Sequence, residues 1–267
     1  MSGGDLPQAS HGISALHLQE GYIKRGLPVV IRELADCWPI SQVCSLTSLR
    51  TTYGNVKAPV RCSGGSWKRL KLCDFIESLG AYEGADVKPY LRTWNFLEDV
   101  PELAALYQPP RHFQDHFQWL PEHQRPPFTW LFVGPRGAAT PLHVDIWHTD
   151  AWLAQLEGRK RFWLFHPKRR AELVQRGLLT DAAASHEEQT RIKPSADAFE
   201  QACKDIPHGM SVLTPGDVIY IPRGWPHQAE ALEDGVSLTS NFLSKQAHAQ
   251  AAVVYMGGQP SPAVYPQ

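Results

Sequence analysis

The sequence predicts a mainly β fold with flanking helices, in which an α/β extension precedes a small antiparallel barrel. From Phe128 onward, short apolar runs alternate with turns that contain glycine and proline, a pattern typical of barrel strands. Before Phe128, most apolar segments have helical spacing. The 267 residues allow one large β domain or two small ones. Because helices are expected both before and within the barrel half, we expect a single domain over residues 13–267.

The N-terminal elaboration, residues 13–127, is expected to follow a disordered tail. Residues 1–12 are polar and contain glycine, which favours disorder. The expected elements of the extension, in chain order, are a helix over 13–24, a buried strand over 28–31, a helix beginning at 45–49 with hydroxyl side chains for its N-cap, a helix over 72–79, a strand over 89–96 and a short helix over 100–107.

The barrel core is expected over residues 128–245, with an insertion at 168–210. The insertion contains two helical patterns, at 168–179 and 196–204, separated by a polar stretch. Long insertions beside a barrel mouth commonly carry binding function. We therefore expect residues 180–204 to act as a lid that selects the substrate, and a solvated linker is the alternative.

Composition excludes several classes of protein. The chain has 26 basic and 27 acidic residues, which argues against a strongly basic nucleic-acid footprint. A local basic patch stays open, because net charge hides how the charges are distributed. Its five cysteines form no CxxC pair, which favours a reducing compartment over a disulfide framework. No signal peptide and no apolar run long enough to span a membrane are visible. These features predict a cytoplasmic protein, and a homodimer is compatible with them.

The most informative motif is His143-Val144-Asp145, which is followed much later by His227. Two histidines and one carboxylate are the ligand set of a mononuclear iron(II) site with open coordination positions. On a strand, residues at i and i+2 point to the same face, and a distant strand would supply the third ligand. Zinc is the alternative metal, but structural zinc prefers closed sites with cysteine or histidine ligands. The sequence therefore predicts iron bound by His143, Asp145 and His227.

Three stretches carry a resemblance to a known family. They are GLPVVIRELADCWP from Gly26, TWLFVGPRGAATPLHVDIWHTDAWLAQLEGRKRFWLFHP from Thr129, and LTPGDVIYIPRGWPHQAEALEDGVSLTSNF from Leu213. Together they resemble the JmjC (cupin-like) branch of iron(II)/2-oxoglutarate oxygenases, roughly from residue 20 to residue 245. The resemblance implies a double-stranded β-helix (a jelly roll), with 2-oxoglutarate and dioxygen as co-substrates and His143, Asp145 and His227 as the catalytic metal ligands.

The resemblance also implies the residues that bind the co-substrate. Lys160 matches the family lysine that anchors the far carboxylate of 2-oxoglutarate, and Thr140 and Tyr90 match hydroxyl residues that join it. Asn241 and Thr239 match polar positions near the metal-bound end. At Leu153 this sequence departs from many relatives, which have a polar or aromatic residue there, so one co-substrate contact is expected to be missing. Strand alternation predicts that Lys160, Phe162 and Leu164 share one face while Arg161, Trp163 and Phe165 share the other.

The resemblance implies a dioxygenase that hydroxylates a C–H bond of a protein or peptide side chain or of a small amino-acid-like substrate. It couples this reaction to the oxidation of 2-oxoglutarate to succinate and carbon dioxide. N-demethylation by the same chemistry is one alternative, but the chain shows no chromatin-reading module. A non-catalytic cupin-like module is a second alternative, although every expected ligand is present. A cupin isomerase is a third, although such enzymes usually carry more histidines and a glutamate. Nucleic-acid and membrane partners are not expected.

Overall fold

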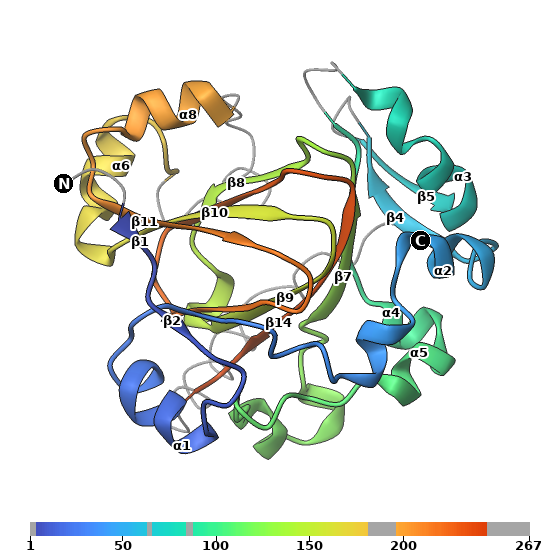
Figure 1. The fold of residues 1–267 in the computed structure, drawn as a ribbon, viewed down its shortest axis with the longest axis horizontal. Helices are drawn as coiled ribbons and strands as arrows, with labels where there is room; N and C mark the ends of the chain where they lie inside the picture. Colours follow the sequence, from blue (N-terminus) through green and yellow to red (C-terminus); the bar gives the residue numbers. More distant parts are fainter. Residues whose placement is uncertain (1–3, 63–65, 84–87, 181–195, 245–267) are drawn as a thin grey trace.

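Two β-sheets facing each other form the centre of the computed structural model (Figure 1). The structure describes residues 4–62, 66–83, 88–180 and 196–244. Most neighbouring strands pair antiparallel, while the short N-terminal strands pair parallel with their neighbours. This architecture confirms the predicted mainly β fold and is that of a double-stranded β-helix.

The smaller sheet has five strands, in the order β1-β11-β10-β13-β8, and the larger has nine, in the order β2-β3-β12-β9-β14-β7-β6-β4-β5. The strands of the smaller sheet are β1 (Gly4–Asp5), β11 (His208–Leu213), β10 (Lys160–Phe165), β13 (His227–Ala231) and β8 (Ala139–His143). Those of the larger sheet are β2 (Gln8–Ala9), β3 (Val29–Ile31), β12 (Val218–Ile221), β9 (Asp150–Glu157), β14 (Gly235–Phe242), β7 (Thr129–Gly134), β6 (Tyr90–Trp94), β4 (Lys57–Arg61) and β5 (Trp67–Lys71).

The helices are short, and all of them except α4 (Phe96–Asp99) lie within the ranges where helical spacing predicts them. The predicted strand over 89–96 ends at Trp94, because Phe96 begins α4. The α-helices are α1 (Ala15–Leu18), α2 (Leu46–Thr51), α3 (Leu72–Glu77), α4 (Phe96–Asp99), α5 (Pro101–Leu106), α6 (Arg170–Gln175) and α8 (Ala196–Cys203), and a π-helix over Gln19–Ile23 continues α1. The 3-10 turns are Pro39–Gln42, Leu79–Tyr82, His116–Trp119, Glu122–Gln124, Ile146–His148 and Pro167–Arg169. Ser45 caps α2 by accepting the Ser48 backbone N–H at 3.1 Å, as the hydroxyl pattern predicts. No helix among the described residues is long and apolar enough to cross a membrane.

The two faces of β10 show how alternation places side chains. Phe162 and Leu164 point into the core between the sheets, where Leu153 also packs. Trp163 and Phe165 point outward and pack against the helices of the insertion. The predicted division of this strand into two faces is confirmed, and it puts Lys160 on the inner side.

The described parts of the insertion cover the outer face of the smaller sheet (Figure 1). Leu173 of α6 and Phe199 of α8 are buried against Trp163 and Phe165. These helices therefore support the sheet from outside. The polar stretch over residues 181–195, on which the expectation of a lid mainly rests, lies outside the described residues.

The structure differs from the predicted disordered tail from Gly4 onward. Residues of β1 pair with Gly209 and Met210, and β2 pairs with Val30 and Ile31. Leu6, between the two strands, is 4% exposed and packs in the inner core. The tail is ordered here because neighbouring strands offer unpaired backbone groups and an apolar site, neither of which twelve local residues can reveal.

Candidate metal centre

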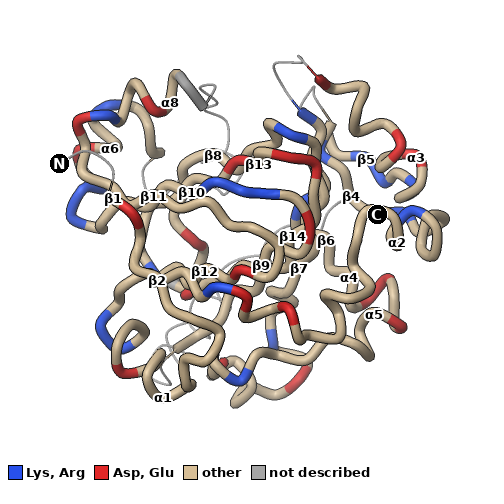
Figure 2. Tube along the Cα trace, viewed as in Figure 1, with Lys and Arg blue, Asp and Glu red and all other residues tan. Residues whose placement is uncertain are grey.

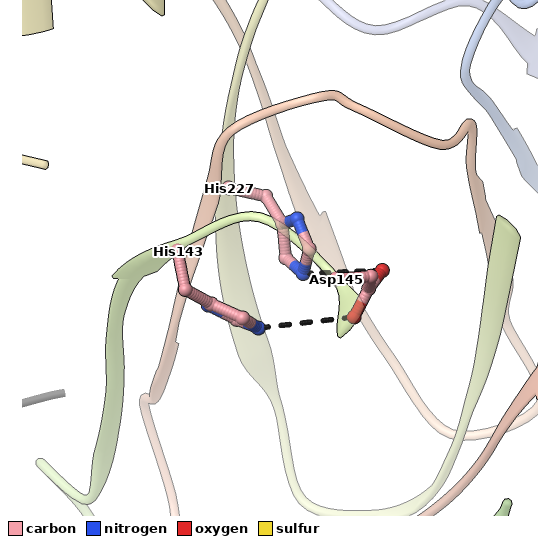
Figure 3. Close-up of side chains that lie close together, drawn as sticks. All are labelled: His143, Asp145 and His227. Carbon is pink, nitrogen blue, oxygen red and sulfur yellow. Dashed lines mark ion pairs between the residues drawn. The ribbon is translucent and has the colours of Figure 1, made fainter. Parts of the chain in front are cut away.

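The three predicted ligands converge at one end of the barrel (Figure 3). His143 ends β8 and lies directly opposite His227, which begins β13. Asp145 follows the end of β8, in extended backbone at φ −59° and ψ 146°. Its carboxylate oxygens lie 4.0 Å from His143 Nε2 and 3.9 Å from His227 Nε2, and one ligand atom from each residue lies within 4.8 Å of the others. Strand pairing therefore brings together residues that are distant in sequence, although Asp145 lies just beyond the strand and not on it.

A β-bulge brings Thr140 to the same face as His143. His227 pairs with His143 and Ala229 pairs with Thr140, so two residue steps on β13 match three on β8. Opposite residues in a sheet point to the same side, and His227 and Ala229 share a face because they are two apart. Thr140 and His143 are three residues apart, and regular alternation would put them on opposite faces. The bulge puts them on the same face.

Backbone carbonyls fix the tautomers of both histidines. The Nδ1 atom of His143 lies 2.9 Å from the Pro141 carbonyl oxygen, and that of His227 lies 2.9 Å from the Trp225 carbonyl oxygen. A carbonyl oxygen can only accept a hydrogen bond, so each Nδ1 carries the proton. Each Nε2 then presents its lone pair on the side of Asp145, which is the arrangement of metal-binding histidines.

The Asp145 carboxylate fits a cation at this position. Its Oδ2 atom is buried and receives no hydrogen bond from the described residues. Burial raises the pKa of Asp145 above its usual range, and the nearby His227 and a hydrogen bond with Asn241 lower it only in part. A buried carboxylate with an unsatisfied oxygen is costly, and a divalent metal removes that cost. The donor set of two nitrogens and one carboxylate therefore fits iron(II).

Lys160 lies elsewhere in the barrel, 4% exposed. Its ammonium donates to the Tyr90 hydroxyl at 3.2 Å and to the Ser237 hydroxyl at 2.5 Å. Burial lowers the pKa of Lys160 to about 7. No carboxylate among the described residues is within ion-pair distance of it. Among the described residues, its recorded partners are hydroxyl groups and the rings of Tyr90 and Phe132. A buried ammonium in such surroundings fits the carboxylate of a small anion.

The flanking arginines do not enter this pocket. Arg159 pairs with Glu233 at 2.7 Å. Arg161 pairs with Glu200 at 2.8 Å and with Glu230 at 3.0 Å. Both arginines lie on the outer side of the smaller sheet. Of these three neighbouring cations, Lys160 is therefore the one that points into the barrel, which composition alone could not tell.

The other predicted co-substrate residues differ in their surroundings. Tyr90 is buried beside Lys160 and is hydrogen-bonded to Thr140, so these three converge as predicted. Asn241 lies beside Asp145 and donates to the Thr149 hydroxyl at 2.8 Å. Thr239 donates to the Trp152 carbonyl oxygen at 2.7 Å, so its hydroxyl proton is committed to the backbone.

Sequence reasoning missed three residues of this interior. Ser237 contacts Lys160 and donates to Gln155 Oε1 at 2.8 Å, and Thr149 holds Asn241. Alternation along β14 was the available signal for Ser237, because it shares a face with Thr239 and Asn241. Gln155 and Thr149 had no comparable signal, since their partners lie on other strands.

A separate cavity of about 320 Å³ lies beside the turn that precedes His227. Its lining includes Trp225, Arg223, His166, Asp150 and Arg25. The Asp150 carboxylate accepts hydrogen bonds from Tyr220, Ser244 and the Arg223 backbone. None of the three candidate metal ligands lines this cavity.

Comparison with known proteins identifies relatives of this chain. Residues 15–248 match the family model described as "Cupin-like domain". "Lysine-specific demethylase JMJ21" of Arabidopsis thaliana is 33% identical over 227 residues, which are 82% of this chain and 23% of that protein. "Bifunctional arginine demethylase and lysyl-hydroxylase psr-1" of Caenorhabditis elegans is 26% identical over 232 residues, 82% of this chain and 56% of that protein.

A third relative is "2-oxoglutarate and iron-dependent oxygenase JMJD4" of Danio rerio, which is 28% identical over 162 residues, 58% of this chain and 36% of that protein. The chain thus spans between about a quarter and about half of the length of these relatives. The matched range contains every strand of both sheets except β1 and β2, and it contains His143, Asp145 and His227. The predicted resemblance is confirmed, and the chain belongs to the cupin-like domain family.

Proposed function

We propose that this protein is an iron(II)- and 2-oxoglutarate-dependent dioxygenase that hydroxylates a side chain of a protein or peptide. The main support for the proposal is that one barrel contains two separate charged groups of opposite sign, Asp145 and Lys160. The Asp145 carboxylate, which has one oxygen without a hydrogen bond from the described residues, lies between two histidine Nε2 atoms. The buried Lys160 ammonium is hydrogen-bonded to the hydroxyl groups of Tyr90 and Ser237. The Asp145 site is suited to a cation such as iron(II), and the Lys160 site is suited to an anion such as 2-oxoglutarate.

The residues have separate roles in this proposal. His143, Asp145 and His227 hold the iron and leave coordination positions open. Lys160, Tyr90 and Thr140 bind the far carboxylate of 2-oxoglutarate, with Ser237 orienting the ammonium. Asn241 lies near the end of 2-oxoglutarate that binds the metal, and its side chain is positioned by a hydrogen bond to Thr149. Iron, 2-oxoglutarate and dioxygen supply the oxidising chemistry when bound, and the protein supplies orientation and exclusion of water.

The substrate class is proposed from the names of the relatives. The names of the relatives refer to lysine and arginine residues of proteins, so we propose such a side chain as the target here. Hydroxylation and N-demethylation begin with the same C–H oxidation. The name of one relative includes both activities, and N-demethylation therefore remains the second candidate. We also propose a cytoplasmic location, on the basis of the cysteine pattern.

The test is anaerobic reconstitution of the purified protein. One iron(II) per chain, a visible charge-transfer band on adding 2-oxoglutarate, and formation of succinate in air are the expected results. Zinc retention with no band and no succinate would contradict the proposal and favour a non-catalytic or zinc-bound module. Mass spectrometry of peptides that contain lysine, arginine or their N-methylated forms then separates the two reactions. Hydroxylation adds one oxygen to the peptide, whereas demethylation removes a methyl group from a methylated peptide as formaldehyde.

A further inference from the structure

Three aromatic side chains gather beside the candidate metal centre. They belong to Phe128, which directly precedes β7, to Trp130 of β7, and to Trp147 in the 3-10 turn that follows Asp145. The Phe128 ring contacts both of the others, with its centroid 5.4 Å from that of Trp130 and 5.1 Å from that of Trp147. We call these three residues the aromatic wall.

Strand register puts Trp130 on the inner face of the larger sheet. Trp130 lies opposite Thr239 of β14. Thr239 is two residues from Ser237, whose hydroxyl contacts the Lys160 ammonium inside the barrel. Residues two apart on a strand share a face, and opposite residues of a strand pair point to the same side. The Trp130 side chain therefore points into the barrel.

The other two members of the aromatic wall are tied to the metal end of the barrel. The Phe128 carbonyl oxygen accepts the backbone N–H of Asn241 at 2.9 Å, and the Asn241 side chain is hydrogen-bonded to Asp145. Trp147 is two residues beyond Asp145 in the chain. The aromatic wall therefore borders the candidate metal centre.

Trp147 has a backbone conformation that its side chain disfavours. Its φ of 52° and ψ of 28° lie in the left-handed region, which glycine and asparagine tolerate and a bulky residue rarely adopts. The turn is held in place because the backbone N–H and the hydroxyl of Thr149 both donate to the Ile146 carbonyl oxygen, at 3.1 Å and 2.7 Å. Asn241 donates in turn to the Thr149 hydroxyl at 2.8 Å. Strain that is held in this way is typical of functional sites.

Packing explains only one member of the aromatic wall. Phe128 is 4% exposed and packs against Phe117 and Leu243. The two tryptophans, in contrast, are only half-buried. A side chain that only filled space at position 147 would not require an indole on a strained backbone, so the presence of tryptophan there indicates a role in binding.

The chemistry of the aromatic wall suits a side chain with an apolar stem and a cationic end. The face of an indole ring attracts a cation, and the same ring packs against methylene groups. Lysine and arginine side chains have both parts. Neither β7 nor β14 contains a charged residue, and both are tan in Figure 2. Among the described residues, the recorded contacts between cations and rings involve neither Trp130 nor Trp147.

We propose that the aromatic wall recognises the target side chain of the polypeptide substrate, with the apolar stem packed along Trp130 and Trp147 and the cationic end on an indole face. This inference rests on the proposed function, because that function supplies a lysine or arginine side chain at the barrel. The turn that carries Trp147 begins at Asp145, so the same short segment sets the position of the target side chain relative to the metal. Trp130 and Trp147 are then specificity-determining residues, which discriminate by charge as well as by shape.

The test uses small probes in two pairs. Nα-acetyl-arginine amide is compared with its neutral citrulline analogue, and Nα-acetyl-lysine amide with its norleucine analogue. The full protein is loaded with manganese(II) and 2-oxoglutarate, so that the paramagnetic ion accelerates the proton relaxation of any probe that binds beside it. We expect at least one cationic probe to bind about threefold to thirtyfold more tightly than its neutral analogue, as a cation on an indole face implies.

Variants of the aromatic wall assign that preference to the indoles. Trp147→Asn keeps a residue that tolerates the left-handed backbone, and Trp130→Leu keeps an apolar side chain. Each should remove most of the preference for the cationic probe while manganese and 2-oxoglutarate still bind, and Trp147→Phe should retain part of it, since a phenyl ring attracts a cation less strongly than an indole. Trp119→Leu is the matched control, because Trp119 is 61% exposed and contacts His116 outside the aromatic wall.

Equal binding of the cationic and neutral probes would overturn the inference. So would a preference that survives in both Trp147→Asn and Trp130→Leu, or one that Trp119→Leu removes to the same extent. If Trp147→Asn loses manganese, Trp130→Leu decides, because Trp130 lies on a strand that carries none of the candidate ligands. Failed discrimination with manganese and 2-oxoglutarate bound contradicts only this inference, whereas failure of the unaltered protein to bind metal and 2-oxoglutarate contradicts the proposed function.

Discussion

The barrel contains two charged sites of opposite sign, and at each of them the described residues leave the charge without a full set of partners. At one, Asp145 is a partly buried carboxylate whose Oδ2 atom is buried without a hydrogen bond from the described residues, between two histidines. At the other, Lys160 is a buried ammonium on hydroxyl groups, with no carboxylate in ion-pair distance among the described residues. Buried charges are costly unless they are paired. Under the proposed function, each site would select its ligand by the charge that the described residues leave unpaired.

The largest effect is expected at the metal end. His143→Ala, Asp145→Ala and His227→Ala should each reduce succinate formation to background, because two remaining donors cannot hold iron with the required geometry. Iron content per chain and circular dichroism check the result, and all three variants should remain folded. Full turnover by Asp145→Ala would remove the assignment of the carboxylate as a metal ligand.

At the other end, Lys160→Ala should raise the 2-oxoglutarate concentration required for turnover by roughly tenfold to hundredfold. A charged, partly desolvated hydrogen bond contributes about 1.5–3 kcal/mol. Iron binding should be unchanged, which is measured by metal content. Arg159→Ala and Arg161→Ala are the matched controls, because these arginines pair with glutamates on the outer side. A larger effect from Arg161→Ala would mean that the inner face of β10 has been misidentified.

The low pKa of Lys160 predicts that co-substrate affinity depends on pH. Burial lowers this pKa to about 7 in the ligand-free protein, and a bound carboxylate favours the charged form and raises it again. Binding therefore takes up a proton above about pH 7, and affinity should fall with rising pH by up to about tenfold per unit.

Calorimetric titration of the manganese-loaded protein with 2-oxoglutarate at several pH values measures this slope. Repeating it in buffers of different ionisation enthalpy counts the protons taken up. Lys160→Arg is the control, since arginine stays charged over this range. A slope that persists in Lys160→Arg would assign the pH dependence to another group.

The smallest effect is expected for Ser237→Ala. Its hydroxyl contacts the Lys160 ammonium and is held by Gln155, so its removal frees one donor of an ammonium that has other partners. We expect about a threefold to tenfold loss of 2-oxoglutarate affinity, from about 1 kcal/mol for one hydrogen bond. Ser240→Ala is a suitable control, because Ser240 is buried on the opposite face of β14. Equal losses in both variants would point to a general effect on the strand.

The sequence by itself determined the features that depend on local periodicity and on short motifs. Alternation along β10 placed Lys160 on the inner face and Arg161 on the outer one, because side chains of a strand alternate regardless of its neighbours. Helical spacing and a hydroxyl cap located α2. The His143-Val144-Asp145 motif with His227 located the candidate metal centre, because the ligand types and the motifs around them can be recognised in the sequence itself.

Only the tertiary structure decided the features that depend on which strands become neighbours. The bulge between β8 and β13 put Thr140 on the same side as His143. Pairing of β9 with β14 brought Gln155 to Ser237, and pairing with β11 and β3 ordered the N-terminal residues. Register aligned Lys57 with Lys71, and Arg61 with Trp67 and Tyr90, across β4, β5 and β6. Each of these contacts joins residues far apart in sequence, so no local pattern could encode it.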